Sequence, residues 1–180
     1  MIILLDLDGP LADFDFGIDM KWNRLHPDKP INFSDRETFS FNNLYDKETV
    51  EEIVNIFFSD NFFENLPLVP GSQEALSTIQ SMPNTEVFIC SSPMFRNPSS
   101  YTSKRNWVYK NFGEDMARRL ILAKDKTMIR GDILIDDKIH IKGTLEPTWQ
   151  HILFTKKFNS GVANQKRIDW LSDWQQVLFS

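Results

Sequence analysis

The sequence predicts an α/β fold in which a parallel β-sheet carries helices on both faces and a small helical cap is inserted after the first strand. Three observations lead to this prediction. Short apolar runs recur along the chain, segments with helical periodicity lie between the later runs, and about fifty residues after the first run break the alternation. Strands that alternate with helices form βαβ units, which assemble into a Rossmann-like, doubly wound parallel sheet.

Five short apolar runs are the expected strands. They are rich in Ile, Leu, Val and Phe, and apolar residues on both faces are typical of a strand buried inside a parallel sheet. The runs cover residues 2–5, 87–90, 120–122, 133–135 and 151–154.

Three segments with helical periodicity are the expected helices of the core. They cover residues 72–82, 101–112 and 168–179. Gly71 or Ser72 can cap the first helix, and Gly113 is expected to end the second. In the third, Trp170 and Trp174 are four residues apart and are expected to share a packed helix face.

The stretch between the first strand and the first core helix is too long for a crossover loop. We expect residues 16–65 to form a helical cap over the carboxyl edge of the sheet, with residues 1–15 and 66–180 as the core. One short helix is expected around Trp22. A second is expected after Asp46, where apolar residues recur at i, i+3, i+4, i+7 and i+8 behind an acidic first turn.

The composition excludes several function classes. With 41% hydrophobic residues and 15 Phe, the 180-residue chain can bury a substantial core and is not a disordered protein. Its single cysteine, Cys90, excludes a disulfide framework and a Cys-based zinc site and fits a cytoplasmic location. The formal net charge of −5 makes polymeric nucleic acid an unexpected partner. No apolar run is long enough to predict membrane insertion.

Two aspartates directly follow the first expected strand. Asp6 and Asp8 are separated by one residue, so in an extended segment their side chains point the same way. Gly9 comes next and allows the chain to turn sharply. Both carboxylates are therefore expected to face one pocket.

Polar residues also follow the other expected strands. Ser91 and Ser92 follow the second, Lys126 comes soon after the third, and Asp136 and Asp137 follow the fourth. Ligands of open α/β sheets bind beyond the carboxyl ends of the strands, so these residues are expected to converge. Carboxylates held together in one site need a cation, and an all-oxygen ligand set suits Mg²⁺.

Such a set supports phosphoryl transfer through an aspartate. One carboxylate attacks phosphorus and forms an aspartyl-phosphate. The second donates a proton to the leaving oxygen and then takes one from the hydrolytic water. Mg²⁺, Lys126 and the serine hydroxyls would stabilise the charge on the phosphoryl oxygens.

The order of these motifs resembles the haloacid dehalogenase superfamily of phosphohydrolases, and more specifically the 5'(3')-deoxyribonucleotidases. The resemblance covers nearly the whole chain. It is carried by residues 4–14, 87–93, 125–127, 134–138 and 147–155 and by the Trp-rich C-terminus. The sequence departs from the family where Pro10, Ser91 and Lys124 replace a small β-branched residue, a threonine and an arginine.

The resemblance implies a role for each motif residue. Asp6 would be the nucleophile and Asp8 the general acid/base. The Asp6 carboxylate, the Asp8 backbone carbonyl and Asp137 would hold Mg²⁺, with Asp136 as neighbouring support. The phosphate would be held by Ser91, Ser92 and Lys126.

The resemblance also implies where the sugar and base would lie. The residues expected to contact them are Phe14, Phe39, Ser40, Phe41 and Met94. The implied substrates are deoxyribonucleoside monophosphates, with dUMP and dTMP preferred, and the implied assembly is a homodimer.

Two alternatives stay open. The same fold and motifs could act on another phosphomonoester, such as a sugar phosphate, because the alternatives differ only in the cap. The chain could also be a nucleotide-binding module without catalysis, although every acidic motif residue is present.

Overall fold

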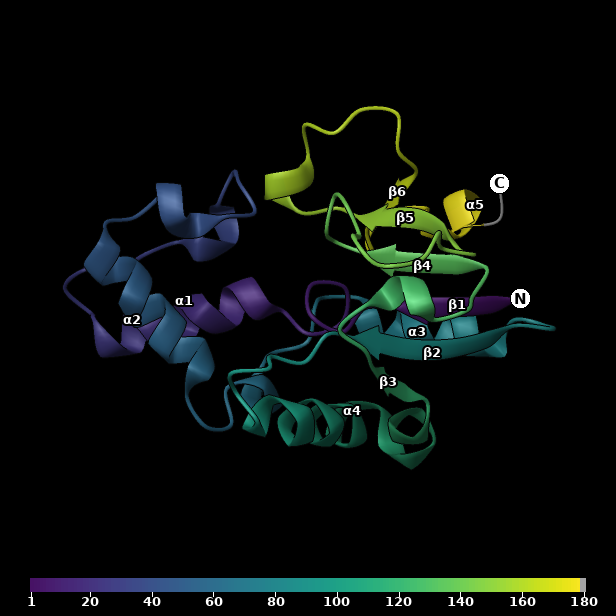
Figure 1. Cartoon of the computed structure of the whole chain (residues 1–180), viewed down its shortest axis with the longest axis horizontal. Helices are drawn as coiled ribbons and strands as arrows, with labels where there is room; N and C mark the ends of the chain where they lie inside the picture. Colours follow the sequence, from purple (N-terminus) through teal and green to yellow (C-terminus); the bar gives the residue numbers. More distant parts are fainter. Residues whose placement is uncertain (179–180) are drawn as a thin grey trace.

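Every strand of the sheet runs parallel to its neighbours in the computed structural model, which describes residues 1–178 (Figure 1). The strand order is β3-β2-β1-β4-β5-β6. The strands are β1 (Ile2–Leu5), β2 (Glu86–Ser91), β3 (Leu120–Leu122), β4 (Ile133–Asp136), β5 (Gln150–Phe154) and β6 (Arg167–Ile168). The Rossmann-like α/β fold is therefore confirmed, and β1 and β4, which end in the acidic motifs, are neighbours at the centre of the sheet.

The helices of the core follow the expected order but differ in two places. They are α3 (Ser72–Ser81), α4 (Ser99–Arg118) and α5 (Trp174–Leu178). The helix is interrupted at Gly113, where it was expected to stop, because the φ of 83° at this residue is not helical; a second helical segment then continues to Arg118.

The predicted C-terminal helix over residues 168–179 is also too long. Ile168 belongs to β6 and pairs with Phe154 of β5, so the chain is extended there and the helix begins only at Trp174. Phe179 lies outside the described residues. Trp170 precedes the helix, yet its ring still packs against that of Trp174 at a centroid distance of 5.5 Å.

Side chains alternate between the two faces of the central strands, so each face has its own core. Ile3 and Leu5 belong to a large buried cluster that includes residues of α3, α4 and the cap. Leu4 and Cys90 face the other way and form a smaller cluster closed by Trp149. Apolar side chains therefore cover both faces of the central strands, at whose ends the carboxyl edge lies.

The cap lies beyond the carboxyl ends of the strands (Figure 1). It contains α1 (Phe14–Leu25), α2 (Lys47–Phe58) and the short 3-10 helices η1 (Phe33–Asp35), η2 (Phe41–Asn43) and η3 (Phe63–Asn65). Asp46 caps α2, because its side chain accepts a hydrogen bond from the Thr49 N–H. The division at residues 16–65 stays a prediction. None of the helices within residues 1–178 is both long enough and apolar enough to cross a membrane.

Candidate active site

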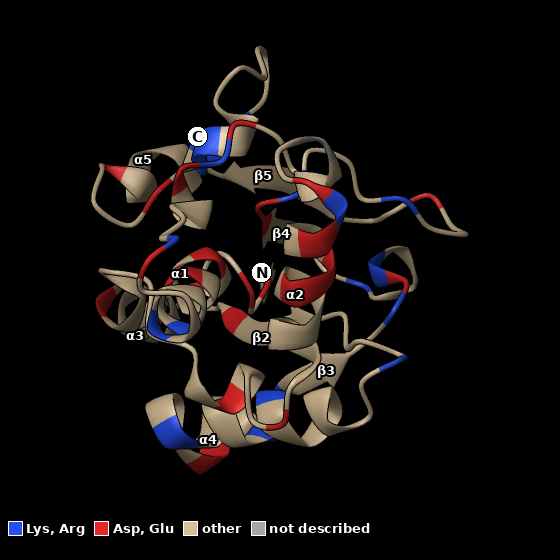
Figure 2. Ribbon diagram, turned by 90° about the vertical axis from the view of Figure 1, so that its left-hand side faces the viewer, with Lys and Arg blue, Asp and Glu red and all other residues tan. Residues whose placement is uncertain are grey.

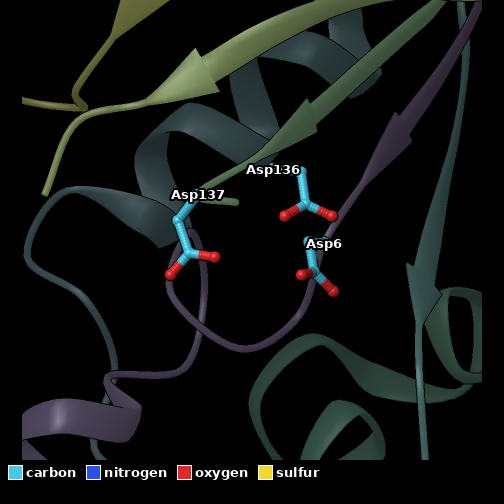
Figure 3. A group of neighbouring side chains, drawn as sticks. All are labelled: Asp6, Asp136 and Asp137. Atoms are coloured by element: carbon cyan, nitrogen blue, oxygen red, sulfur yellow. The ribbon is translucent and has the colours of Figure 1, made fainter. Parts of the chain in front are cut away.

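Three buried carboxylates meet where β1 and β4 end. Asp6 follows β1, Asp136 is the last residue of β4, and Asp137 comes next. Each residue offers an oxygen within 4.8 Å of the others (Figure 3). Their exposed fractions are only 4%, 0% and 8%. So much negative charge in so little solvent requires nearby positive charge.

Lys126 supplies part of that charge. Its Nζ is 2.7 Å from Asp6 Oδ1 and 2.6 Å from Asp136 Oδ2. Burial alone would lower the pKa of Lys126, but the charges of these two aspartates raise it above its ordinary value. Lys126 therefore stays charged, and its role at the phosphate stays a prediction.

The pKa values of the three carboxylates are shifted in different directions. Burial would raise the pKa of Asp6, but Lys126 and Lys138 outweigh it and hold that pKa below its usual value. Burial and the Asp6 charge raise the pKa of Asp136 to about 6. Burial, followed by the charges of Asp136 and Asp6, raises the pKa of Asp137 well above its usual range. Asp6 is thus the carboxylate that the protein itself keeps ionised.

The hydrogen bonds show which carboxylate oxygens are free. Asp136 uses both oxygens, one on Lys126 Nζ at 2.6 Å and one on the Lys138 N–H at 2.9 Å. Within the described part of the chain, no donor contacts the Asp137 carboxylate or Asp6 Oδ2. The oxygens open to a cation therefore come from Asp6 and Asp137, and Asp136 orients Lys126.

Gly9 allows the loop after β1 to pass close to Asp137. Its φ is 104°, a backbone conformation that favours glycine. A Cβ at this position would overlap the Asp137 carboxylate. The glycine therefore lets the Asp8–Gly9 backbone lie directly against Asp137.

Asp8 faces the cavity and has a partner that the sequence analysis missed. Lys104 of α4 forms an ion pair with Asp8 Oδ2, and its Nζ is 2.9 Å from Ser91 Oγ. The Lys104 side chain is 1% exposed, and its Nζ also lies 4.7 Å from the centre of the Phe63 ring. Asp8 Oδ1 is buried with no partner among the described residues, so one oxygen of this carboxylate is available to a ligand.

The two serines occupy different places. Ser91 is fully buried behind the Asp8–Lys104 pair. Ser92 lines the cavity, and its hydroxyl donates to the Ala123 backbone carbonyl at 2.9 Å. A hydroxyl that donates to the protein still has an oxygen that can accept, so Ser92 is oriented and not blocked.

A cavity of about 350 Å³ opens beside these groups. Asp6, Asp8 and Asp137 lie in its wall, and the rest of the lining is mainly aromatic. The apolar lining residues are Phe14, Phe33, Phe39, Phe41, Phe57, Phe63 and Met94. An anion-handling edge thus adjoins a wall suited to a flat, apolar ring.

Four of the five residues expected at the sugar and base line this cavity: Phe14, Phe39, Phe41 and Met94. Ser40 does not, and it is exposed. Its backbone is extended, with φ −83° and ψ 120°, so its side chain points away from the side that its two phenylalanine neighbours share. The structure therefore does not bring Ser40 to the site.

Asp15 and Arg36 are further lining residues that the sequence analysis missed. They form a buried ion pair, with Arg36 Nη2 3.0 Å from Asp15 Oδ1. Burial raises the pKa of Asp15 despite the Arg36 charge. Twenty-one residues separate the two, so nothing in the local sequence links them.

Cys90 was expected to be a buried, inert thiol, and the structure agrees. The residue is fully buried in the smaller core. Burial raises the pKa of its thiol to about 11, which leaves almost no thiolate near neutral pH.

Comparison with known proteins shows the same family along the whole sequence. Residues 1–179 match the family described as 5' nucleotidase, deoxy (pyrimidine), cytosolic type C protein. The chain is 38% identical to the human mitochondrial 5'(3')-deoxyribonucleotidase over 99% of its own length and 82% of the relative's. It is 32% identical to the human cytosolic-type enzyme, over 99% and 93% of the two chains.

Solved structures share the fold at much lower identity. A haloacid dehalogenase-like family hydrolase from Streptococcus pneumoniae superposes with a TM-score of 0.62 at 15% identity, over 99% of this chain and 98% of that one. This likeness supports the assignment of the fold.

Proposed function

Since the chain belongs to the 5'(3')-deoxyribonucleotidase family of haloacid dehalogenase-like phosphatases, we propose that it hydrolyses deoxyribonucleoside monophosphates in a Mg²⁺-dependent reaction, with dUMP and dTMP as preferred substrates. The observation that carries this proposal is the cavity itself. Its buried carboxylate edge suits a phosphate with a cation, and its aromatic wall suits a nucleobase.

Asp6 is the proposed nucleophile. It stays ionised because Lys126 and Lys138 hold its pKa low, and its Oδ2 has no protein partner among the described residues. An ionised, unpartnered carboxylate oxygen at the cavity wall can attack phosphorus and form an aspartyl-phosphate.

Asp8 is the proposed general acid and base. It is two residues from Asp6 and lines the same cavity, and its Oδ1 is free. From there it can protonate the leaving oxygen of the nucleoside and later accept a proton from the hydrolytic water. Lys104 fixes the other oxygen of Asp8 and so orients the carboxyl group.

The residues present fit a Mg²⁺ ion. Asp6 Oδ2 and the Asp137 carboxylate offer hard oxygen donors without hydrogen-bond partners among the described residues, and Gly9 leaves room for the Asp8 backbone beside them. When bound, Mg²⁺ would stabilise negative charge on the phosphoryl oxygens.

The cap favours a nucleotide over a smaller phosphomonoester. A base is flat and apolar on its faces, and burial against aromatic rings stabilises it. Phe14 lies at the centre of this wall, with ring centroids 5.5–6.2 Å from those of Phe57, Phe62 and Phe63. A sugar phosphate without a base would leave this surface uncovered.

The charge distribution supports a small ligand. Figure 2 shows Lys and Arg residues spread over several elements and mixed with Asp and Glu. A polymeric nucleic acid would favour a continuous basic surface. The proposed partner is therefore a mononucleotide.

The test is phosphate release from dUMP, dTMP, dGMP, UMP and several sugar phosphates, with Mg²⁺ and with excess EDTA. We expect metal-dependent turnover led by dUMP or dTMP, and Asp6→Asn is expected to lower kcat by at least about 10³-fold. Asp28→Asn serves as the matched control, because it removes an exposed carboxylate that does not line the cavity.

Each other result has a definite meaning. Faster turnover of a sugar phosphate than of any nucleotide would overturn the role of the aromatic wall. Nucleotide binding without turnover would favour a binding module. Full activity of Asp6→Asn would overturn the nucleophile assignment.

A further inference from the structure

Asp15 and Arg36 form a charged pair in the cavity wall that the chemistry at phosphorus does not use. Asp15 lies in the first turn of α1 and Arg36 directly follows η1. They are only 4% and 8% exposed, and both line the cavity. Asp15 is not part of the three-carboxylate cluster. Burial of charge costs free energy, so a buried ion pair in a wall of phenylalanines points to a function for that pair.

Arg36 is held firmly from several sides. Its Nε and Nη2 contact Asp15 Oδ1 at 3.3 and 3.0 Å, and its Nη1 donates to the Thr38 and Phe39 carbonyls at 2.9 and 2.8 Å. Its guanidinium carbon lies 4.0 Å from the centre of the Phe158 ring, which comes from the core. Arg36 therefore fixes both Asp15 and the segment that carries Phe39.

These contacts involve only one of the two carboxylate oxygens of Asp15. Arg36 binds Oδ1, whereas none of the described residues donates a hydrogen bond to Oδ2. A carboxylate oxygen without a protein donor can accept a hydrogen bond from a ligand. Because Asp15 lines the cavity, a bound substrate is the group that can supply this donor.

The position of Asp15 indicates which part of a nucleotide it meets. Asp15 follows Phe14, one ring of the aromatic wall, and lines the same cavity as Asp8 and Asp137 of the carboxylate edge. It is therefore close to the phosphate end of the cavity. The sugar lies between phosphate and base, and a deoxyribonucleoside 5'-monophosphate carries its free hydroxyl at C3'.

We propose that Asp15 accepts a hydrogen bond from the free sugar hydroxyl of the nucleotide, and that Arg36 is the positioning residue that holds Asp15 for this contact. This inference rests on the proposed function and deepens it. For a 3'-monophosphate bound through its phosphate, the equivalent donor is the 5'-hydroxyl. A second phosphate at that position brings a negative charge toward Asp15 and is rejected.

The test compares the best deoxyribonucleoside 5'-monophosphate with its 2',3'-dideoxy analogue, which lacks only the hydroxyl. A site built to bind a hydroxyl discriminates strongly against the analogue without it, because its buried polar group is left unpaired. We expect the ratio of kcat/KM for the two substrates to be about tenfold or more in the wild-type protein, typical of a hydrogen bond to a charged group. This measurement needs no variant.

Variants show which residues produce the difference in kcat/KM between the two substrates. Asp15→Asn keeps the shape but removes the charge, so the ratio is expected to fall severalfold. Asp28→Asn is the control, because Asp28 is an exposed carboxylate of the cap that does not line the cavity. Its ratio is expected to equal that of the wild type. Arg36→Lys keeps the charge but loses the paired contact with Asp15, and a lower ratio is expected.

The outcomes separate this inference from the function on which it rests. Absence of turnover for every nucleotide overturns the proposed function together with the inference. Turnover of nucleotides with a wild-type ratio near one overturns the inference alone. An unchanged ratio in Asp15→Asn overturns the role of Asp15, and an unchanged ratio in Arg36→Lys overturns the positioning role of Arg36.

Discussion

The carboxylate edge of the cavity and its aromatic wall are built in opposite ways. The edge places its charged groups on a few loops that follow parallel strands, and Lys126 joins Asp6 and Asp136 at hydrogen-bond distance beside Asp137. The wall collects rings from well-separated positions between Phe14 and Phe63, in contact through faces and edges at centroid distances above 5 Å.

This difference predicts how strongly substitutions in each region should affect activity. At the edge, removal of one charge leaves its partner buried and uncompensated, so effects should be large. In the wall, one ring can be replaced by another apolar side chain with moderate repacking, so effects should be graded. Substitutions at the edge should therefore lower activity more than substitutions in the wall.

Lys104→Met should produce the largest of these effects. Methionine keeps much of the side-chain length, but Asp8 loses the cation that orients it. General acid–base catalysis contributes about 10²–10⁴-fold, so we expect kcat to fall by roughly 10²-fold while KM changes little. Steady-state kinetics on the preferred nucleotide measures this.

The control for this variant is Lys110→Met on the same helix, because Lys110 is exposed. Its kcat should equal that of the wild type. A Lys104→Met protein that folds normally and retains its kcat would show that the edge is no more sensitive than the wall.

Phe14→Leu should have an intermediate effect. Leucine fills part of the space but cannot stack on a base, and aromatic contacts contribute about 0.5–1.5 kcal/mol beyond their buried area. We expect kcat/KM for the nucleotide to fall roughly tenfold, mainly through KM. Phe16→Leu changes a half-exposed ring on the same helix and should have no such effect.

A small alkyl phosphate separates the two contributions to this result. It has no base, so its turnover should be equal in the wild type and in Phe14→Leu. Equal losses for both substrates would mean that Phe14 supports the edge and not the base.

Asp125→Asn should have the smallest effect, on stability in acid. Asp125 precedes Lys126 and accepts hydrogen bonds from the Thr127 hydroxyl at 2.6 Å and the Thr144 N–H at 2.7 Å. These bonds lower its pKa to about 2. A lowered pKa gives stability that is present above the unfolded value of about 4 and is lost as the pH falls toward 2.

Urea unfolding at pH 7, 4 and 3 measures this effect. The wild type should be more stable than Asp125→Asn at pH 7, and the difference should shrink as the pH falls below 4. A difference that stays constant with pH would mean that the Asp125 charge does not hold this loop.

The contrast between edge and wall also explains what the sequence could predict. The sheet and the edge motifs are local: each apolar run is followed directly by its polar residues, as at Leu5–Asp6 and Ile135–Asp136. Because parallel strands end at one edge, local order was enough to bring Asp6, Asp136 and Asp137 together.

Lys104 required knowledge of which face of α4 is buried. A lysine within a helix normally lies on the solvated face. Yet Lys104 is one helical spacing from Ser100, Trp107 and Val108, all of them fully buried. This helical spacing could have indicated that Lys104 is buried, but a charged residue is normally expected on the exposed face.

Other differences follow from pairings that are distant in sequence. Asp15 and Arg36 meet only through the folding of the cap, so neither residue predicts the other. β6 contains only two residues, too few to show a strand pattern in the sequence. Its pairing with β5 makes the chain extended at Ile168, where the sequence predicts a helix. Ser40 was placed at the site by the family resemblance, but an extended backbone turns its side chain away from those of Phe39 and Phe41.

The close approach of Gly9 to Asp137 has a consequence for the evolution of this protein. Any side chain at position 9 would require both a rarely adopted backbone conformation and displacement of Asp137. The turn after β1 and the carboxylate after β4, more than a hundred residues apart, can therefore change only as one inherited unit. Diversification of substrate range is left to the aromatic cap, where residues can be exchanged one at a time.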